Sequence, residues 1–209
     1  MEFKIGIRPS PLALKQAEEA LVFLKERFPN ARFHIVKIAT PGDRDKNTPL
    51  FEVDGSDFFT RDIDEALISG QIDFAVHSAK DLPDVLPQGL SVFVETQPLS
   101  PFDALVSKGN IKLAVLAQAS RIGVSSARRK LRIKVLRPDL IIVDVRGTIE
   151  ERLRLIDDGK IDALIVAHAA LIRLGLEKRA SEILPLEIFK AHPKQGRLAI
   201  LTRKEYEKG

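Results

Sequence analysis

Basic and hydroxyl residues recur where apolar, strand-like segments give way to helix-like segments. Three of these junctions carry, in chain order, Arg8 with Ser10, then Ser126 with Arg128 and Arg129, then Arg146 with Arg152. An arginine near the start of a helix opposes the helix dipole, so its repetition favours a bound anion that offsets the repulsion. The planar arginine fork matches a carboxylate, and a ligand with several carboxylates therefore explains the three junctions together. At any single junction, pairing with surface carboxylates is the competing interpretation.

A fourth strand-like segment ends at His77 and leads directly to Lys80 and Asp81, the one acid–base candidate in the chain. An aspartate beside several cations stays ionised, and its carboxylate can stabilise a positive centre or hold a protonated nitrogen. Without further context, a structural aspartate in a loop is the competing interpretation.

Other kinds of site lack the residues that they need. The chain has no cysteine, which excludes disulfides, thiolate metal sites and any cofactor attached through sulfur. No metal site is predicted, because metal-ligand spacing is absent among the histidines, which are His34, His77, His168 and His192. The net charge is +4, but aromatic residues make up 6% and lie mostly in apolar runs, which disfavours nucleic acid and favours an anionic small molecule.

Composition describes an ordinary globular protein, with 44% hydrophobic and 30% charged residues. No apolar run is long enough for a membrane helix, and the N-terminus lacks the apolar core of a secretory signal, so we expect a cytoplasmic location. A single methionine, no tryptophan and many charged residues are typical of a thermophile.

Strand-like and helix-like segments alternate along the chain, which predicts an α/β fold with mainly parallel sheets. Helices are expected after the capping residues Ser10, Thr60, Ser126 and Thr148, and a short one over 169–174. Residues 39–57 are expected to form a long loop. Strands are predicted over 3–7, 33–38, 73–77, 90–95, 104–106, 121–124, 140–145, 163–167 and 198–201.

Proline residues near position 100 mark a hinge, which predicts one lobe over 1–99 plus 190–209 and a second lobe over 100–189. The final strand is expected to return to the first lobe. The tetrapeptides Gly-Gln-Ile-Asp (70–73) and Gly-Lys-Ile-Asp (159–162) each precede a predicted strand. This repetition indicates two similar lobes.

Several longer blocks of sequence closely resemble the porphobilinogen deaminase (hydroxymethylbilane synthase) family, in its order and spacing. They are IGIRPSPLALKQA (5–17), TPGDRDKNTPL (40–50), DFAVHSAKDLP (73–83), SSARRK (125–130), RPDL (137–140), VRGT (145–148) and LIRLGL (171–176). The resemblance implies two lobes of the type II periplasmic-binding-protein kind with a ligand cleft between them, and a third domain bearing a cysteine. It also implies a transferase that condenses four porphobilinogens on a dipyrromethane primer.

The resemblance further implies residue roles. Asp81 would be the catalytic carboxylate that acts on the pyrrole nitrogens, and Phe59 and Gln195 would also lie in the cleft. The residues implied to hold the acetate and propionate groups are Arg8, Ser10, Lys80, Ser126, Arg128, Arg129, Arg146 and Arg152.

The chain departs from the family pattern because it has no cysteine and ends about where the third domain is expected to begin. Residues 52–57 are acidic where the family has a lysine-bearing glycine segment. We therefore expect no covalent primer, and a non-covalent dipyrromethane is the remaining cofactor. Two functions stay open: a divergent or split deaminase whose third domain comes from a partner chain, and a non-catalytic protein that binds a small anion or a tetrapyrrole precursor. A nucleic-acid-associated effector lobe is disfavoured, since no helix-turn-helix is visible.

Overall fold

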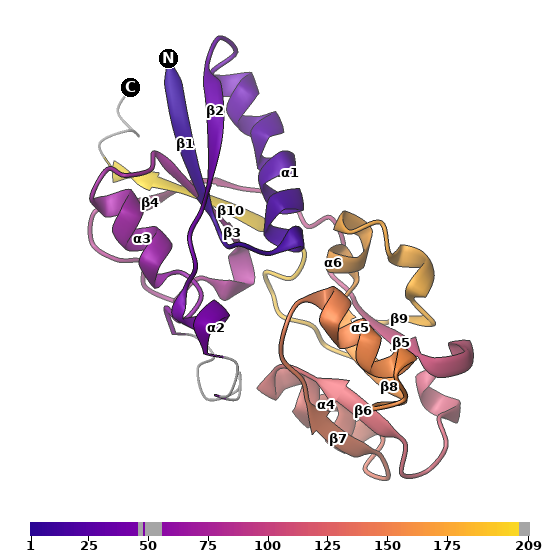
Figure 1. The fold of residues 1–209 in the computed structure, drawn as a ribbon. Helices are drawn as coiled ribbons and strands as arrows, with labels where there is room; N and C mark the ends of the chain where they lie inside the picture. Colours follow the sequence, from indigo (N-terminus) through magenta and orange to yellow (C-terminus); the bar gives the residue numbers. More distant parts are fainter. Residues whose placement is uncertain (46–47, 49–55, 205–209) are drawn as a thin grey trace. The chain divides into compact units, whose positions relative to one another are not determined.

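The computed structural model describes residues 1–45, 48 and 56–204, which divide into two compact units (Figure 1). The described residues of Met1–Asp45, Gly55–Pro98 and Arg197–Gly209 form unit 1. Those of Lys46–Asp54 and Leu99–Gly196 form unit 2. No helix within the described part of the chain is long and apolar enough to cross a membrane.

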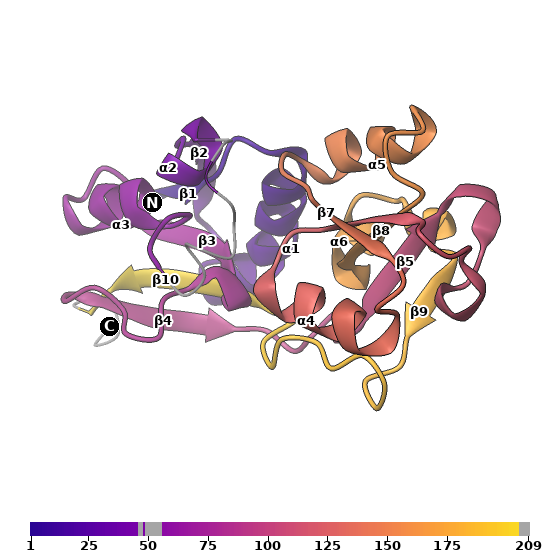
Figure 2. The same ribbon diagram turned by 90° about the horizontal axis from the view of Figure 1, so that it is seen from below.

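Unit 1 contains a five-stranded sheet of order β2-β1-β3-β10-β4 (Figure 2). β1 pairs in parallel with β2 and β3, whereas β10 pairs antiparallel with β3 and β4. Four strands therefore share one direction and β10 opposes them. The strands are β1 (Glu2–Ile7), β2 (Arg32–Lys37), β3 (Phe74–Ser78), β4 (Leu90–Glu95) and β10 (Leu198–Arg203).

Helices cover both faces of this sheet. Side chains alternate between the two faces along each strand, so apolar residues on both faces need to be covered. Phe74 and Val76 of β3 pack in one cluster with the apolar side of α1, whereas Ala75 lies in a second cluster with α3. Both faces of the central strand are thus buried. The helices of unit 1 are α1 (Pro11–Arg27), α2 (Pro41–Arg44), α3 (Arg61–Ile68) and the 3₁₀ turn η2 (Ala79–Asp81).

Unit 2 contains a sheet of order β7-β6-β8-β5-β9, in which β5 runs against the other four strands. Ile133 of α4 is fully buried in one cluster with Leu105, Ile122 and Ile165. The strands are β5 (Asp103–Ser107), β6 (Arg121–Val124), β7 (Ile141–Asp144), β8 (Ala163–Ala167) and β9 (Glu182–Leu184). The helices are α4 (Ala127–Leu136), α5 (Ile149–Asp157) and α6 (His168–Arg173), with 3₁₀ turns η3 (Lys108–Asn110), η4 (Leu113–Val115) and η5 (Glu177–Arg179).

The repeated tetrapeptides predicted two similar lobes, and the two sheets have the same strand order and directions, with β7-β6-β8-β5-β9 corresponding to β2-β1-β3-β10-β4. The chain connectivity differs, because the antiparallel strand comes last in unit 1 and first in unit 2. Each tetrapeptide lies between a helix and the central strand, from α3 to β3 in unit 1 and from α5 to β8 in unit 2. Its isoleucine packs against a glycine of the neighbouring parallel strand, β1 in unit 1 and β6 in unit 2. A Cβ on Gly6 would lie 2.3 Å from Ile72 Cδ1, and a Cβ on Gly123 would lie 2.8 Å from Ile161 Cδ1. Both β1 and β6 therefore need a glycine at this point of close approach.

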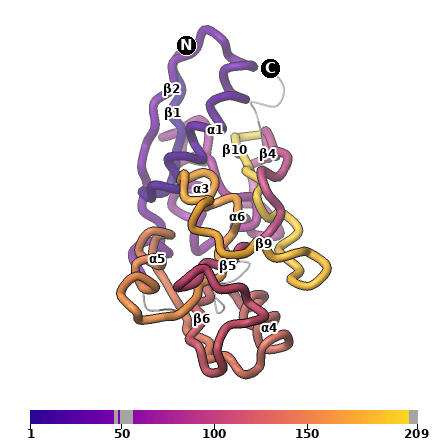
Figure 3. Tube along the Cα trace, turned by 90° about the vertical axis from the view of Figure 1, so that its right-hand side faces the viewer, coloured from indigo at the N-terminus to yellow at the C-terminus, as the bar shows by residue number. Residues whose placement is uncertain are grey.

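The final strand confirms the predicted return of the chain. β10 lies between β3 and β4 in the sheet of unit 1, and Figure 3 shows this yellow segment beside β4. Leu99–Gly196 is consequently inserted between two strands that are neighbours in unit 1.

Two expectations from the sequence need correction. The predicted loop over 39–57 contains the short helix α2, which begins with a capping box between Thr40 and Asp43. Only part of that predicted loop lies in the described residues. The predicted lobe boundaries also shift, because Leu99 and residues 190–196 belong to unit 2. Leu99 N donates to Gly196 O (3.2 Å), so the two chain segments at the boundary hold each other.

Candidate functional site: strand-end residues in each unit

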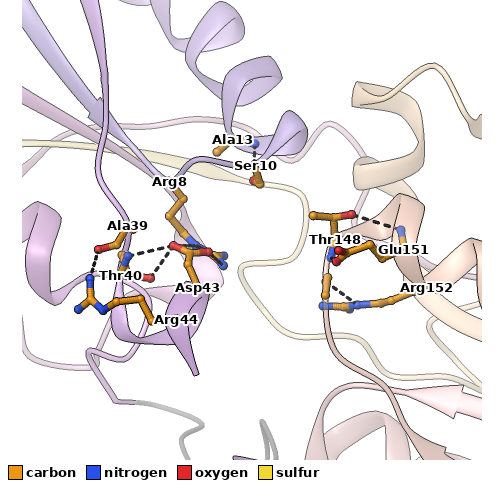
Figure 4. A network of polar contacts seen from close by, with 11 residues as sticks. Arg8, Ser10, Ala13, Ala39, Thr40, Asp43, Arg44, Thr148, Glu151 and Arg152 are labelled. Carbon is orange, nitrogen blue, oxygen red and sulfur yellow. Dashed lines mark hydrogen bonds and ion pairs between the residues drawn. The ribbon is translucent and has the colours of Figure 1, made fainter. Parts of the chain in front are cut away.

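The first predicted junction of unit 1 is a capped helix start. Ser10 is the N-cap of α1, and its hydroxyl oxygen accepts from Ala13 N at 3.1 Å (Figure 4). Pro11 occupies the first helical position, where the absence of an N–H has no cost. No acidic residue lies in the first turn of α1. The positive end of this helix is therefore not neutralised by its own first turn.

Arg8, at the end of β1, is fixed on two sides. Its Nε and Nη2 donate to the carboxylate of Asp43, with an Nη2–Oδ1 distance of 2.5 Å. Its guanidinium carbon lies 4.4 Å from the centroid of the Phe59 ring, in cation–π geometry. Asp43 is held in turn by Thr40, whose N and Oγ1 both donate to Oδ2 (Figure 4). The fork of Arg8 is therefore preorganised by the start of α2.

These contacts set the ionisation of Asp43. Its burial opposes ionisation, but hydrogen bonds from Arg8 and Thr40 outweigh burial, so the pKa of Asp43 lies below its ordinary value of 3.8. A lowered folded-state pKa stabilises the fold above the unfolded-state pKa, and this stabilisation is lost as the pH falls through the folded-state pKa.

Asp43→Asn should therefore flatten the acid side of the pH–stability profile. Below about pH 4, wild-type stability should fall more steeply than that of Asp43→Asn, because the variant has no proton to take up here. Urea unfolding at a series of acid pH values measures this difference. Parallel profiles for the two proteins would contradict the assigned ion pair.

The loop after β3 carries Lys80 and Asp81 in the 3₁₀ turn η2. The loop is fixed from two directions: Gln16 Nε2 of α1 donates to Ser78 Oγ (2.7 Å), and Ala79 N donates to Arg197 O (3.0 Å). Asp81 is partly exposed, and its carboxylate forms no hydrogen bond or ion pair with any described residue. This carboxylate is therefore available to a ligand.

The corresponding junction of unit 2 has the same chemistry. Ser126 is the N-cap of α4 and accepts from Arg129 N at 3.4 Å, and the first turn of α4 has no acidic residue. Arg128 is exposed and has no hydrogen-bond or ion-pair partner among residues 1–45, 48 and 56–204. Its guanidinium is thus presented to solvent beside an uncompensated helix start.

Arg129 and Gln195, both predicted to line the ligand site, lie in a buried network instead of on an open surface. Arg129 is 7% exposed, and its Nε and Nη2 donate to Asp103 at 3.2 and 2.6 Å. Gln195 Nε2 makes a short hydrogen bond to Asp103 Oδ1. Asp103, only 2% exposed, is therefore the centre of this network. Direct contact of Arg129 and Gln195 with a ligand stays a prediction.

The third junction begins α5 with a reciprocal capping box. Thr148 N donates to Glu151 Oε2 (2.7 Å), and Glu151 N donates to Thr148 Oγ1 (Figure 4). Arg152 folds back onto the same loop, donating from Nε to Gly147 O and from Nη1 to Ser125 Oγ, both at 2.9 Å. Arg146 Nη1 donates to the carbonyl oxygen of Thr48. The start of α5 thus carries its own carboxylate, unlike the start of α4.

Sequence reasoning missed the residues that orient the predicted ones. Asp43 orients Arg8, Gln16 orients the loop at Ser78, and Asp103 orients Arg129. The spacing Thr40–Asp43 is that of a capping box and could have indicated α2. Nothing local links Asp103 to Arg129, because 26 residues separate the two partners.

Comparisons with known proteins agree with the resemblance in sequence. Residues 3–208 match the family model described as porphobilinogen deaminase, dipyromethane cofactor binding domain. The porphobilinogen deaminase of Geobacter metallireducens is 42% identical over 99% of this chain and 64% of its own length. That of Chlorobium limicola is 41% identical over 97% of this chain and 65% of its own length. The chain thus spans slightly less than two thirds of these relatives.

Solved structures show the fold. The methionine-binding protein MetQ matches with a TM-score of 0.60 and 15% identity, over 99% of this chain and 84% of that protein. A variant of the OxyR2 regulatory domain from Vibrio vulnificus matches with a TM-score of 0.54 and 15% identity, over 98% and 87%. The predicted α/β fold of the type II periplasmic-binding-protein kind is confirmed.

Proposed function

Because the chain belongs to the porphobilinogen deaminase family of tetrapyrrole biosynthesis, we propose that it binds porphobilinogen or a related pyrrole polycarboxylate through its strand-end residues. One observation carries the proposal. In each unit, the helix that follows the equivalent strand, β1 in unit 1 or β6 in unit 2, has a serine N-cap and no acid in its first turn. Helix starts of this kind bind anions, and each has an arginine beside it, Arg8 or Arg128.

The described geometry supports different roles for the residues. Arg128 is the readiest partner for a ligand carboxylate, because no described residue competes for its guanidinium. Ser10 can donate its hydroxyl hydrogen to a ligand while its oxygen caps α1. Asp81 is an acceptor for a pyrrole N–H or a protonated nitrogen, and an ionised carboxylate there stabilises positive charge that develops during condensation.

The dipyrromethane cofactor of the family fits part of this donor set. Its carboxylates suit the exposed cation of Arg128 and the amide groups at the start of α4. The 209 residues contain no cysteine, so they offer no thiolate for a covalent bond to the cofactor. We propose that these residues hold a dipyrromethane without a covalent bond, and that a partner chain supplying a third domain is one source of the thiol.

A second function, non-catalytic binding of a tetrapyrrole precursor or another small anion, needs only the helix starts and the exposed Arg128 and no thiol. The two functions differ in turnover, because only a transferase converts porphobilinogen into bilane. Incubation with porphobilinogen, with and without a cysteine-bearing third domain, distinguishes them. If bilane forms, Asp81→Asn should abolish its formation, and an equally active variant would remove Asp81 from the mechanism.

Calorimetry with porphobilinogen tests the binding site. Arg128→Ala should weaken binding by about 1–3 kcal/mol, the usual cost of losing a hydrogen bond to a charged group. Lys134→Ala is the matched control, because it removes the same charge from the exposed last turn of the same helix. Equal effects of the two substitutions would indicate nonspecific attraction and would contradict a site at the start of α4.

A further inference from the structure

Arg8 differs from Arg128 in its local charge. Asp43 occupies the Nε and Nη2 side of the Arg8 guanidinium, and the side chains of Asp43 and Arg8 are only 15% and 28% exposed. The ion pair therefore carries little net charge. Nη1 of Arg8 forms no hydrogen bond with any described residue, so the outer edge of the fork still offers directed N–H groups.

The carboxylate of Asp43 is fixed and cannot easily move away from Arg8. Thr40 donates to Oδ2 from its backbone N at 3.0 Å and from its hydroxyl at 2.9 Å. The adjacent Gly42 lies against Phe59, since a Cβ there would be 2.2 Å from the ring. The ring in turn lies against the Arg8 guanidinium. Arg8 is thus held from two sides, by Asp43 with Thr40 on one side and by Phe59 with Gly42 on the other.

We propose that Asp43 is a specificity-determining residue, which neutralises Arg8 so that its outer edge binds a planar carboxylate of the ligand by geometry and rejects simple inorganic anions. This inference rests on the proposed function of the same residues. A free arginine attracts any anion through its charge. A paired and fixed guanidinium has little net charge and binds mainly an acceptor whose geometry matches its remaining N–H donors.

The test compares inorganic phosphate and porphobilinogen as probes at constant ionic strength, with NMR titration for the first and calorimetry for the second. Asp43→Asn should tighten phosphate binding by about two- to fivefold, the size expected for unmasking one partly exposed charge. The affinity of Asp43→Asn for porphobilinogen should not rise, because Arg8 is less firmly oriented in this variant. The preference for porphobilinogen over phosphate should therefore fall.

Asp139→Asn is the matched control, because Asp139 forms a two-point ion pair with Arg137 in unit 2, with distances of 2.8 and 2.6 Å. It changes the net charge equally, but its effect on phosphate affinity should stay well below about twofold. The double variant Arg8→Ala/Asp43→Asn should lose the gain in phosphate affinity. Circular dichroism verifies that each variant is folded.

The outcomes separate this inference from the proposed function. An equal gain in Asp139→Asn, no gain in Asp43→Asn, or an equal rise in porphobilinogen affinity would overturn the role of Asp43. If the wild type does not bind porphobilinogen, the proposed function fails, and the phosphate comparison still decides whether Asp43 masks Arg8.

Discussion

Replacing Asp103 with alanine should lower the free energy of unfolding by about 3–5 kcal/mol, because it leaves the guanidinium of Arg129 buried without its counter-ion. Arg129 is 7% exposed and directs Nε and Nη2 at Asp103. Its remaining contact, from Nη1 to Ile165 O at 3.5 Å, is too long to compensate. Urea unfolding monitored by circular dichroism measures the loss.

Asp144→Ala provides the comparison for this prediction. Asp144 also pairs with a cation of α4, with 2.9 Å between its Oδ2 and Lys130 Nζ, but its side chain is 50% exposed. Water can replace it as the partner of the lysine, so its loss should be much less destabilising. Similar losses of unfolding free energy in the two variants would show that the burial of Arg129 does not increase the cost of removing its partner.

Gly196→Ala should destabilise the fold by about 2–5 kcal/mol, the sum of a left-handed backbone cost and an overpacking cost. Gly196 has a φ of +82°, and a Cβ at this position would lie 2.2 Å from the backbone oxygen of Ser100. That atom belongs to the main chain at the unit boundary, so it cannot move aside as a side chain would. Thermal unfolding of the variant gives the shift.

Gly159→Ala separates the two costs. Gly159 also has a positive φ, +67°, but no described residue beyond its chain neighbours has an atom within 4 Å of the point where a Cβ would lie. Only the backbone term should appear, about 1–2 kcal/mol. If both variants lose the same stability, the close approach of Gly196 to Ser100 contributes nothing.

These predictions bear on function because the affected residues orient the candidate ligand contacts. Asp103 fixes Arg129 at the start of α4, next to the exposed Arg128. A substitution that unfolds this region locally would weaken ligand binding even if the substituted residue does not contact the ligand. Binding measurements on Arg128 therefore need the stability of each variant beside them.

Much of the secondary structure could be predicted because its signals are local. Ser10 and Ser126 cap their helices as expected, and the capping box of Thr148 and Glu151 is present. The helix α2 was missed, since its four residues, from Pro41 to Arg44, are too few to show an apolar period. The short edge strand β9 was missed for a related reason, because three residues are too few for alternation to be visible.

The places of the predicted residues along the strands and helices could be predicted, but their contacts could not. The sequence predicted Arg8, Arg128 and Arg129 at strand-to-helix junctions; Arg8 directly follows β1, and Arg128 and Arg129 lie in the first turn of α4. It did not distinguish the exposed Arg128 from the buried Arg129, although the two are adjacent. Their difference depends on Asp103, which the fold brings to α4 from another strand.

The amino-acid sequence by itself determined the alternation of strands and helices, the helix caps, the α/β class and the family. These depend on neighbours within a few residues, or on patterns that survive along the whole chain. Only the tertiary structure decided which cation has a counter-ion. The partners Arg8 and Asp43 are 35 residues apart, and Gln195 and Asp103 are 92 apart. Arg8 meets Asp43 because the parallel strands β1 and β2 bring their carboxyl ends to one edge of the sheet. Gln195 meets Asp103 where the antiparallel strand β5 begins, and no local pattern reports either contact.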